Sequence, residues 1–197
     1  LCAGLAELGT RHVVVAEVSC FQLTHCPTFR PRVAVFTNIA EDHVDYHGSF
    51  AAYQAAKRTL AAHQREGDVV VWNHDDELMS QWDWPGSAEH VMYSARFPLA
   101  PGVFVDGGHI VVALRGQHAY RLIACDDIRI PGAHNLENAM AAAAAALAFG
   151  IPKEAVRAAL MTFPGLEHRI EFVAEIDAVR YYNDSKATNP HAALAGL

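Results

Sequence analysis

Two polar residues stand where α/β proteins often perform chemistry. Glu17 ends an apolar run over residues 11–17, and His43 lies in a loop rich in acids and imidazoles, residues 37–47, which follows a second apolar run over residues 32–37. Short continuous apolar runs predict buried strands of a parallel sheet. The carboxyl ends of such strands meet at one edge, where open α/β sheets bind ligands. We therefore expect Glu17 and His43 to lie close together and to suit a divalent cation such as Mg²⁺.

Two other interpretations of these residues stay open. From their spacing alone, Glu17 and His43 are also consistent with ordinary polar residues at strand ends. Alternatively, Glu17 with Asp42, His43, Asp45 and His47 could bind Zn²⁺ and activate water, as in a metal-dependent hydrolase. The two histidines are four apart but lie in a loop without the helical H-E-x-x-H arrangement. Tight zinc binding with no nucleotide requirement would favour the hydrolase.

Lys57 belongs to a helix predicted over residues 49–62, with Ser49 as its N-cap. A single helical lysine is usually a solvated surface residue. The surrounding residues are mostly small and apolar, however, including Ala55 and Ala56. Apolar surroundings favour the neutral amine, which can take up CO₂ as a carbamate. Lys57 would then place an anion beside a metal.

An asparagine pair begins a second predicted helix. Asn135 opens an Ala-rich segment that runs through Ala148 and ends at Gly150. Asn138 is three residues further on, so the two amides share one helix face and could offer donor and acceptor groups to a heterocycle such as adenine. An N-cap followed by a surface asparagine explains the pair equally well.

The last 33 residues contain two further polar motifs, around Arg169 and Asp184. Arg169 could clamp a phosphate, and Asp184 could accept hydrogen bonds from ribose hydroxyls. Strands are predicted over residues 170–176 and 179–182, between the two motifs. Pro164-Gly165 precedes them and is a plausible domain boundary. We expect one domain over residues 1–164 and the start of another over residues 165–197.

The elements between these motifs predict an α/β fold. Strand, helix and strand over residues 32–37, 49–62 and 68–73 imply a right-handed crossover and a mostly parallel sheet flanked by helices. Residues 103–114 surround Asp106-Gly107-Gly108, which indicates a hairpin and hence a small antiparallel subsheet. A further helix is predicted from Pro152 to about Phe163.

Composition limits the classes of partner. The chain has 197 residues, 52% of them hydrophobic, and a formal net charge of −7, with no basic block to attract nucleic acid. Its four cysteines form no C-x-x-C pair, which is typical of reduced thiols in a cytosolic protein. No apolar run is long enough to span a bilayer. We expect a cytoplasmic protein without a membrane partner, and no feature predicts an oligomer rather than a monomer.

The motifs resemble those of the Mur ligase superfamily in their order and amino-acid sequence, and within it those of the D-glutamate-adding (MurD) branch. The resemblance covers almost the whole chain. Its motifs are Glu17-Val18-Ser19-Cys20-Phe21-Gln22-Leu23, Thr37 to Asp45, Tyr53 to Lys57, Gly132 to Asn138, Gly165 to Arg169, and Asn183-Asp184-Ser185-Lys186-Ala187-Thr188-Asn189. The first and last of these are specific to this branch.

The resemblance implies a role for each candidate residue. Residues matching Glu17 and His43 bind two Mg²⁺ ions, and the lysine matching Lys57 is carbamylated and supports one of them. Residues matching Asn135 and Asn138 receive the adenine of ATP. Phosphate and ribose contacts match Arg169 and Asp184, and contacts to the muramoyl peptide or the incoming glutamate match Ser19, Gln22, Lys186 and Thr188.

The resemblance also implies a fold and an activity. The fold is a P-loop NTPase-like central domain followed by the start of a Rossmann-like C-terminal domain. The activity is ATP-dependent addition of D-glutamate to UDP-N-acetylmuramoyl-L-alanine through an acyl phosphate, in peptidoglycan precursor synthesis. Another branch of the superfamily is the alternative. No Gly-rich phosphate loop precedes Glu17, so we expect this chain to be part of a longer enzyme and to be inactive alone.

Overall fold

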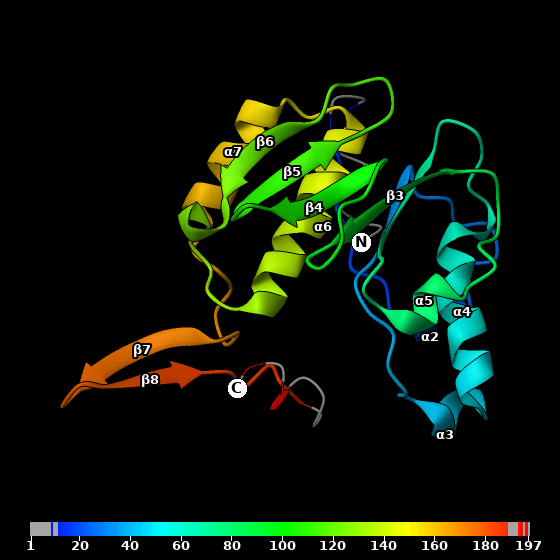
Figure 1. The fold of residues 1–197 in the computed structure, drawn as a ribbon. Coiled ribbons are helices and arrows are strands. Elements are labelled where there is room, and N and C mark those ends of the chain that lie inside the picture. The colour runs from blue at the N-terminus through cyan, green and yellow to red at the C-terminus, as the bar shows by residue number, and fades with distance from the viewer. Residues whose placement is uncertain (1–8, 10–11, 189–192, 195, 197) are drawn as a thin grey trace.

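The computed structural model describes residues 9, 12–188, 193, 194 and 196. Its main feature is one six-stranded sheet with the strands in sequence order (Figure 1). The strands are β1 (Val33–Phe36), β2 (Val69–Asn73), β3 (Glu89–Ser94), β4 (Gly102–Asp106), β5 (His109–Ala113) and β6 (Tyr120–Ala124). Strands β1 to β4 are parallel, and β4 to β6 are antiparallel. The expected α/β fold is confirmed, and the antiparallel part continues the parallel sheet rather than forming a separate one.

Helices cover both faces of this sheet. The larger ones are α4 (Phe50–Ala62), α6 (Ala133–Phe149) and α7 (Lys153–Thr162), and the short ones are α2 (Cys20–Leu23), α3 (Val44–His47), α5 (Glu77–Ser80) and the 3₁₀ turn η1 (Cys125–Asp127). Strand β2 shows how the two faces form, because its side chains alternate. Val69 and Val71 pack in the core that contains Met140 of α6, whereas Val70 and Trp72 pack in the core that contains residues of α2, α4 and α5.

The predicted parallel strand–helix–strand unit is confirmed. Val33 of β1 pairs with Val69 of β2 in a parallel ladder, with α4 between them in the chain. Helix α4 begins after Ser49, whose hydroxyl accepts a hydrogen bond from the Ala52 backbone N–H at 3.1 Å. That bond satisfies a donor that the first helical turn would otherwise leave without a partner. The local sequence therefore determined where this helix starts.

Helix α6 begins two residues earlier than predicted. Its N-cap is Gly132, at φ +101°, so Asn135 lies inside the first turn and its amide donates to the Pro131 carbonyl at 2.7 Å. A residue with a β-carbon is strained at this positive φ, so the turn requires glycine. The predicted end at Gly150 and the helix from Pro152 to Phe163, observed as α7, are confirmed.

The strand predicted over residues 11–17 is wrong for the residues that the structure describes. Residues 12–19 have no regular secondary structure, and Val15 is 94% exposed. An apolar run becomes a strand only where a neighbouring strand satisfies its backbone groups. Among the described strands, β2 is the one that pairs with β1, and residues 12–19 join neither. Arg11, the first residue of the predicted strand, lies outside the described part.

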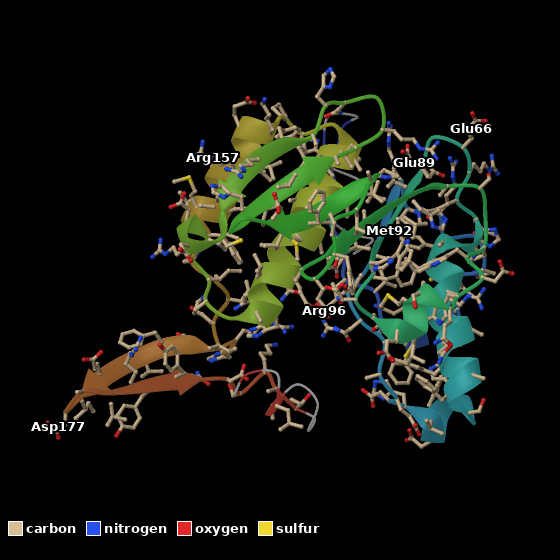
Figure 2. The ribbon with its side chains drawn as sticks, in the orientation of Figure 1. Glu66, Glu89, Met92, Arg96, Arg157 and Asp177 are labelled. Atoms are coloured by element: carbon tan, nitrogen blue, oxygen red, sulfur yellow. The ribbon has the colours of Figure 1, made fainter. Side chains whose placement is uncertain are left out.

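Strands β7 (Glu171–Ile176) and β8 (Val179–Asn183) form a separate antiparallel pair. Figure 1 shows this hairpin standing apart from the six-stranded sheet, and Figure 2 shows Asp177 at its far tip. Asp177 and Ala178 both have positive φ, as a tight two-residue hairpin turn requires. The strands predicted here are therefore confirmed, and the domain boundary at Pro164-Gly165 stays a prediction.

Among the described residues, no helix has both the length and the apolar character needed to cross a membrane.

Candidate functional site

The structure brings three of the predicted metal-site residues to one cavity. The cavity has a volume of about 390 Å³ and is lined by Glu17, Val18, Ser19, Cys20, Gln22, Asp42, His43, Tyr53 and Lys57. These residues come from the segment before α2, from α2 itself, from the loop before α3, and from α4. Glu17 reaches the cavity although it does not end a strand, because the capped start of α2 follows it directly.

His43 is held in an unusual backbone conformation beside the cavity. Its φ is +51°, a left-handed value that costs energy for a residue other than glycine. The ring centre lies 4.7 Å from that of Phe21, and Nδ1 lies 3.5 Å from a carboxylate oxygen of Asp42. The same Asp42 oxygen accepts a hydrogen bond from the His43 backbone N–H at 2.8 Å. Phe21 and Asp42 therefore orient the imidazole.

Lys57 lies half-buried on α4 at the same cavity. Its Nζ is 5.6 Å from the centre of the Tyr53 ring, and in the described part of the chain no carboxylate forms an ion pair with it. Burial, together with the electrostatic influence of the nearby Cys20 and Asp42, raises the pKa of Tyr53, so the ring stays a neutral phenol. The amine is thus next to an aromatic face rather than a neutralising acid.

With a carbamate on Lys57, the residues at this cavity would fit the Mg²⁺ site that the family resemblance implies. Among the described residues, no three His, Cys, Asp or Glu side chains cluster closely enough to hold a metal. A carbamate on Lys57 would add oxygen ligands to the Glu17 carboxylate and the His43 imidazole, around a cavity that has room for water. Mg²⁺ prefers oxygen ligands and retains several waters, so this donor set suits it.

Ser19 and Gln22 have a structural role that the sequence analysis did not assign. The Ser19 hydroxyl accepts from the Gln22 backbone N–H at 3.3 Å, and the Gln22 side-chain oxygen accepts from the Ser19 N–H at 2.9 Å. This reciprocal pair is a capping box that starts α2. The S-x-x-Q spacing is its sequence signal. Both residues also line the cavity, so capping leaves them able to meet a ligand.

The asparagine pair lies on the other face of the sheet, at the start of α6. Asn135 is half-buried and Asn138 is exposed. Glu137, between them, accepts a hydrogen bond at 3.2 Å from the side chain of Asn73, which ends β2. Burial raises the pKa of the Glu137 carboxyl, and this donated hydrogen bond partly opposes that rise. The start of α6 is therefore attached to the carboxyl end of the parallel strands.

The β7–β8 hairpin brings the two C-terminal motifs together. The Asp184 carboxylate accepts from the Ile170 N–H at 3.2 Å, next to Arg169, and the Lys186 N–H donates to the His168 carbonyl at 3.0 Å. The side chains of Arg169, Lys186 and Thr188 are exposed, and Asn189 lies outside the described residues. No hydrogen bond between described residues joins positions 166–188 to positions 12–163, and none of these groups lines the cavity.

Four residues that position the site were not predicted from the sequence: Asn73, Asp75, Asp76 and Tyr93. Asn73 ends the buried strand β2, and the two aspartates come just after it. The signal that identified His43, polar residues at the carboxyl end of a parallel strand, was therefore present. Tyr93 is fully buried, and its hydroxyl donates to the Thr37 carbonyl at 3.2 Å. Tyr93 lies inside β3 rather than at its carboxyl end, so no sequence pattern marked it.

Comparison with known proteins identifies the fold. Residues 3–146 match the Mur ligase middle domain. The chain belongs to the Mur ligase family. UDP-N-acetylmuramoylalanine–D-glutamate ligase of Pelotomaculum thermopropionicum is 47% identical over 199 residues, which cover the whole chain and 43% of that protein. The enzyme of the same name from Geobacillus kaustophilus is 45% identical over 89% of the chain and 38% of its own length.

Solved structures of Mur ligases share this fold. The MurF ligase of Thermotoga maritima in complex with ADP has a TM-score of 0.61 at 15% identity and covers 90% of this chain and 41% of its own. MurF of Acinetobacter baumannii has a TM-score of 0.58 at 22% identity, covering 84% of this chain and 36% of its own. The chain spans about two fifths of the length of these relatives. The family resemblance is confirmed, and the zinc hydrolase is not supported.

Proposed function

We propose that the complete protein carrying this chain is an ATP-dependent ligase that joins D-glutamate to UDP-N-acetylmuramoyl-L-alanine in peptidoglycan precursor synthesis. The observation that carries this proposal is the meeting of Glu17, His43 and Lys57 at one cavity of a Mur ligase middle domain. Relatives that bear the name of this activity are 39–47% identical over most of the chain. Those names favour the D-glutamate branch over another Mur ligase branch.

The reaction has two chemical steps. The alanyl carboxylate attacks the γ-phosphorus of ATP in line, the bond to ADP breaks, and an acyl phosphate forms. The amine of D-glutamate then adds to the acyl carbon, loses a proton, and phosphate leaves with its bonding electrons. A carboxylate is a poor acylating agent and the mixed anhydride is a good one. Two bound Mg²⁺ ions would neutralise charge that develops on the phosphates.

The residues of this chain hold the groups that react. Glu17, His43 and the Lys57 carbamate are the proposed metal ligands, and Ser19 and Gln22 face the same cavity as contacts for the muramoyl peptide. Asn135 and Asn138 receive adenine at the start of α6. The contacts proposed for the C-terminal motif are phosphate at Arg169, ribose at Asp184, and substrate or glutamate at Lys186 and Thr188.

The distance between these groups requires a movement. The β7–β8 hairpin stands apart from the sheet in Figure 1, whereas its residues must reach the same nucleotide as α6. Closure of the segment after Pro164-Gly165 would assemble the site and exclude water. A crosslink that freezes this boundary should therefore lower the rate, and an unchanged rate would contradict closure.

Two further expectations accompany this proposal. The described cysteines, Cys20, Cys26 and Cys125, are free thiols, which suits a protein of the reducing cytoplasm. We propose a monomer that meets small molecules alone: ATP, UDP-N-acetylmuramoyl-L-alanine and D-glutamate. Sedimentation of the complete protein with and without these substrates checks this, because a dimer would double the mass.

Phosphate release by the complete protein tests the proposed activity. ATP, Mg²⁺ and UDP-N-acetylmuramoyl-L-alanine are supplied with D-glutamate, L-lysine, diaminopimelate or no amino acid. Release that depends on D-glutamate supports the proposal. Release driven by another amino acid would assign the protein to another branch. If no amino acid drives phosphate release, the ligase proposal is refuted.

The carbamate has its own test. With ¹³C-labelled bicarbonate, the wild-type protein should show a carbamate carbonyl signal by NMR. Lys57→Ala should remove this signal. Lys153→Ala is the matched control, because Lys153 also lies near a tyrosine ring, at 5.0 Å from the centre of Tyr120, but on α7. A signal that survives in Lys57→Ala would exclude Lys57 as its source.

A further inference from the structure

The turn after β2, residues 73–76, makes hydrogen bonds to three other parts of the fold. Its sequence is Asn73-His74-Asp75-Asp76, and it joins β2 to α5. Arg96, labelled in Figure 2 just past the carboxyl end of β3, marks the edge of the sheet where this turn lies. None of these residues is among the proposed ligand contacts, so their polar character needs another explanation.

Asp76 uses both of its carboxylate oxygens as acceptors. Oδ1 accepts from the N–H groups of Leu78 and Met79, at 3.0 Å each, and so caps α5. Oδ2 accepts from the Ile39 N–H at 2.9 Å. Met79 and Ile39 are both buried, at 0% and 6% exposure. Asp76 therefore ties α5 to the loop that carries His43 four residues further on.

Asn73 makes the corresponding link to α6. Its Nδ2 donates to Glu137, and its Oδ1 accepts from the Asp75 N–H at 3.0 Å. The Asp75 carboxylate accepts from the Ser94 hydroxyl and from the Ala95 N–H, so the turn is also fixed to the end of β3. Asn73 is 4% exposed, so these bonds are shielded from competing water.

We infer that the 73–76 turn is a positioning element. It fixes the position of the loop that carries His43 relative to the start of α6, where adenine is proposed to bind. The inference rests on the proposed function, in which both must meet one ATP molecule, at its phosphates and at its base. When a mutation far from the reacting atoms misplaces them by 1 Å, the rate can fall about 100-fold. Asp76 and Asn73 are positioning residues in this scheme, because each acts through its hydrogen bond to another residue, Ile39 or Glu137.

The chemistry of Asp76 allows its two bonds to be separated. Serine is a good N-cap, so Asp76→Ser in the complete protein keeps the cap of α5, but its shorter side chain cannot also reach the Ile39 N–H. Asp76→Ala loses both bonds. Glu77→Ala is the matched control, because Glu77 is an exposed acid in the first turn of the same helix.

The two Asp76 variants should differ in stability but share a higher Mg²⁺ requirement. Asp76→Ser should melt at a higher temperature than Asp76→Ala, yet both should need at least about tenfold more Mg²⁺ for half-maximal phosphate release. Glu77→Ala should match the wild type. Hydrogen exchange should show faster exchange of residues 37–43 in both Asp76 variants. A normal Mg²⁺ requirement and normal exchange in Asp76→Ser would overturn the inference for Asp76 and leave it a helix cap.

The hydrogen bond from Asn73 to Glu137 is tested by exchanging its donor and its acceptor. Asn73→Asp places a carboxylate against Glu137 and should raise the KM for ATP at least about tenfold, by repulsion and a lost bond. Adding Glu137→Gln restores a donor and an acceptor in the opposite order and should recover most of that loss. A double variant no better than Asn73→Asp, or a single variant with wild-type KM, would overturn this part.

The design separates this inference from the proposed function. If the wild-type protein releases no phosphate with any amino acid, the ligase proposal fails. The exchange of residues 37–43 in Asp76→Ser still decides whether the turn holds the loop, because that measurement needs no catalysis. Normal exchange would overturn the inference in that case too, and faster exchange would support it.

Discussion

The Lys57 Nζ lies 5.6 Å from the centre of the Tyr53 ring, one helical turn earlier on α4. Residues four apart on a helix face the same way, so α4 alone places both groups at the cavity. A cation over an aromatic face is stabilised by about 0.5–1 kcal/mol where it is partly exposed. This contact holds the unmodified, charged amine at the cavity, where no carboxylate of the described residues forms an ion pair with it.

Replacing Lys57 should remove most of the activity. Both Lys57→Ala and Lys57→Arg should lower the rate of phosphate release about 100-fold, because neither residue can carry a carbamate and an arginine cation would repel Mg²⁺. Steady-state kinetics of the complete protein measures this, with Lys153→Ala as a control that should keep its rate. Wild-type turnover in either Lys57 variant would remove Lys57 from the mechanism.

The capping box allows the two roles of Gln22 to be separated. Gln22→Glu retains a residue that can accept from the Ser19 N–H, so the melting temperature should change little. The new charge at the cavity should nevertheless raise the KM for the anionic UDP substrate. Gln22→Ala should lose the box as well, at about 1 kcal/mol. Equal KM values for Gln22→Glu and the wild type would refute a ligand contact at this position.

The buried carboxylate of Asp68 should make stability depend on pH. Its hydrogen bond from Arg30, at 2.7 Å, and one from the Arg65 N–H lower its pKa against the opposing effect of burial. A lowered folded-state pKa gives stability that is complete above the unfolded value, about 3.9, and is lost as pH falls through the folded value.

Asp68→Asn should therefore destabilise the chain at pH 7 by about 1–2 kcal/mol, and the difference from the wild type should shrink below about pH 4. Urea unfolding can be followed by the fluorescence of the three tryptophans, which all lie in one part of the fold: Trp72, Trp82 and Trp84. A difference that stays constant down to pH 2.5 would contradict this account of Asp68.

Glu137 should have the opposite pH dependence. Burial raises its pKa, so its charge opposes folding, and this cost is absent below the unfolded value of about 4.3 and grows as pH rises through the folded value. Glu137→Gln removes the charge and can still accept from Asn73. At pH 7 we expect its melting temperature to rise by about 1–2 °C, with no difference from the wild type at pH 4. A lower melting temperature at pH 7 would contradict a cost of burial.

Local sequence patterns determined most elements of this fold. Continuous apolar runs predicted β1 and β2, Ser49 predicted the start of α4, and the Asp-Gly-Gly turn predicted the β4–β5 hairpin. These features depend on interactions within a few residues, so their signals are local. The motif order also identified the family, and through that resemblance it proposed a role for each candidate residue.

The tertiary structure decided which of these elements meet. Residues 13–16 are as apolar as β1 but have no strand partner, and the meeting of Glu17, His43 and Lys57 depends on how α2 and α4 pack. The bonds of Asp76 to Ile39 and of Asn73 to Glu137 join residues 37 and 64 positions apart. Such partners depend on the order and register of the strands across the sheet, which local patterns do not specify.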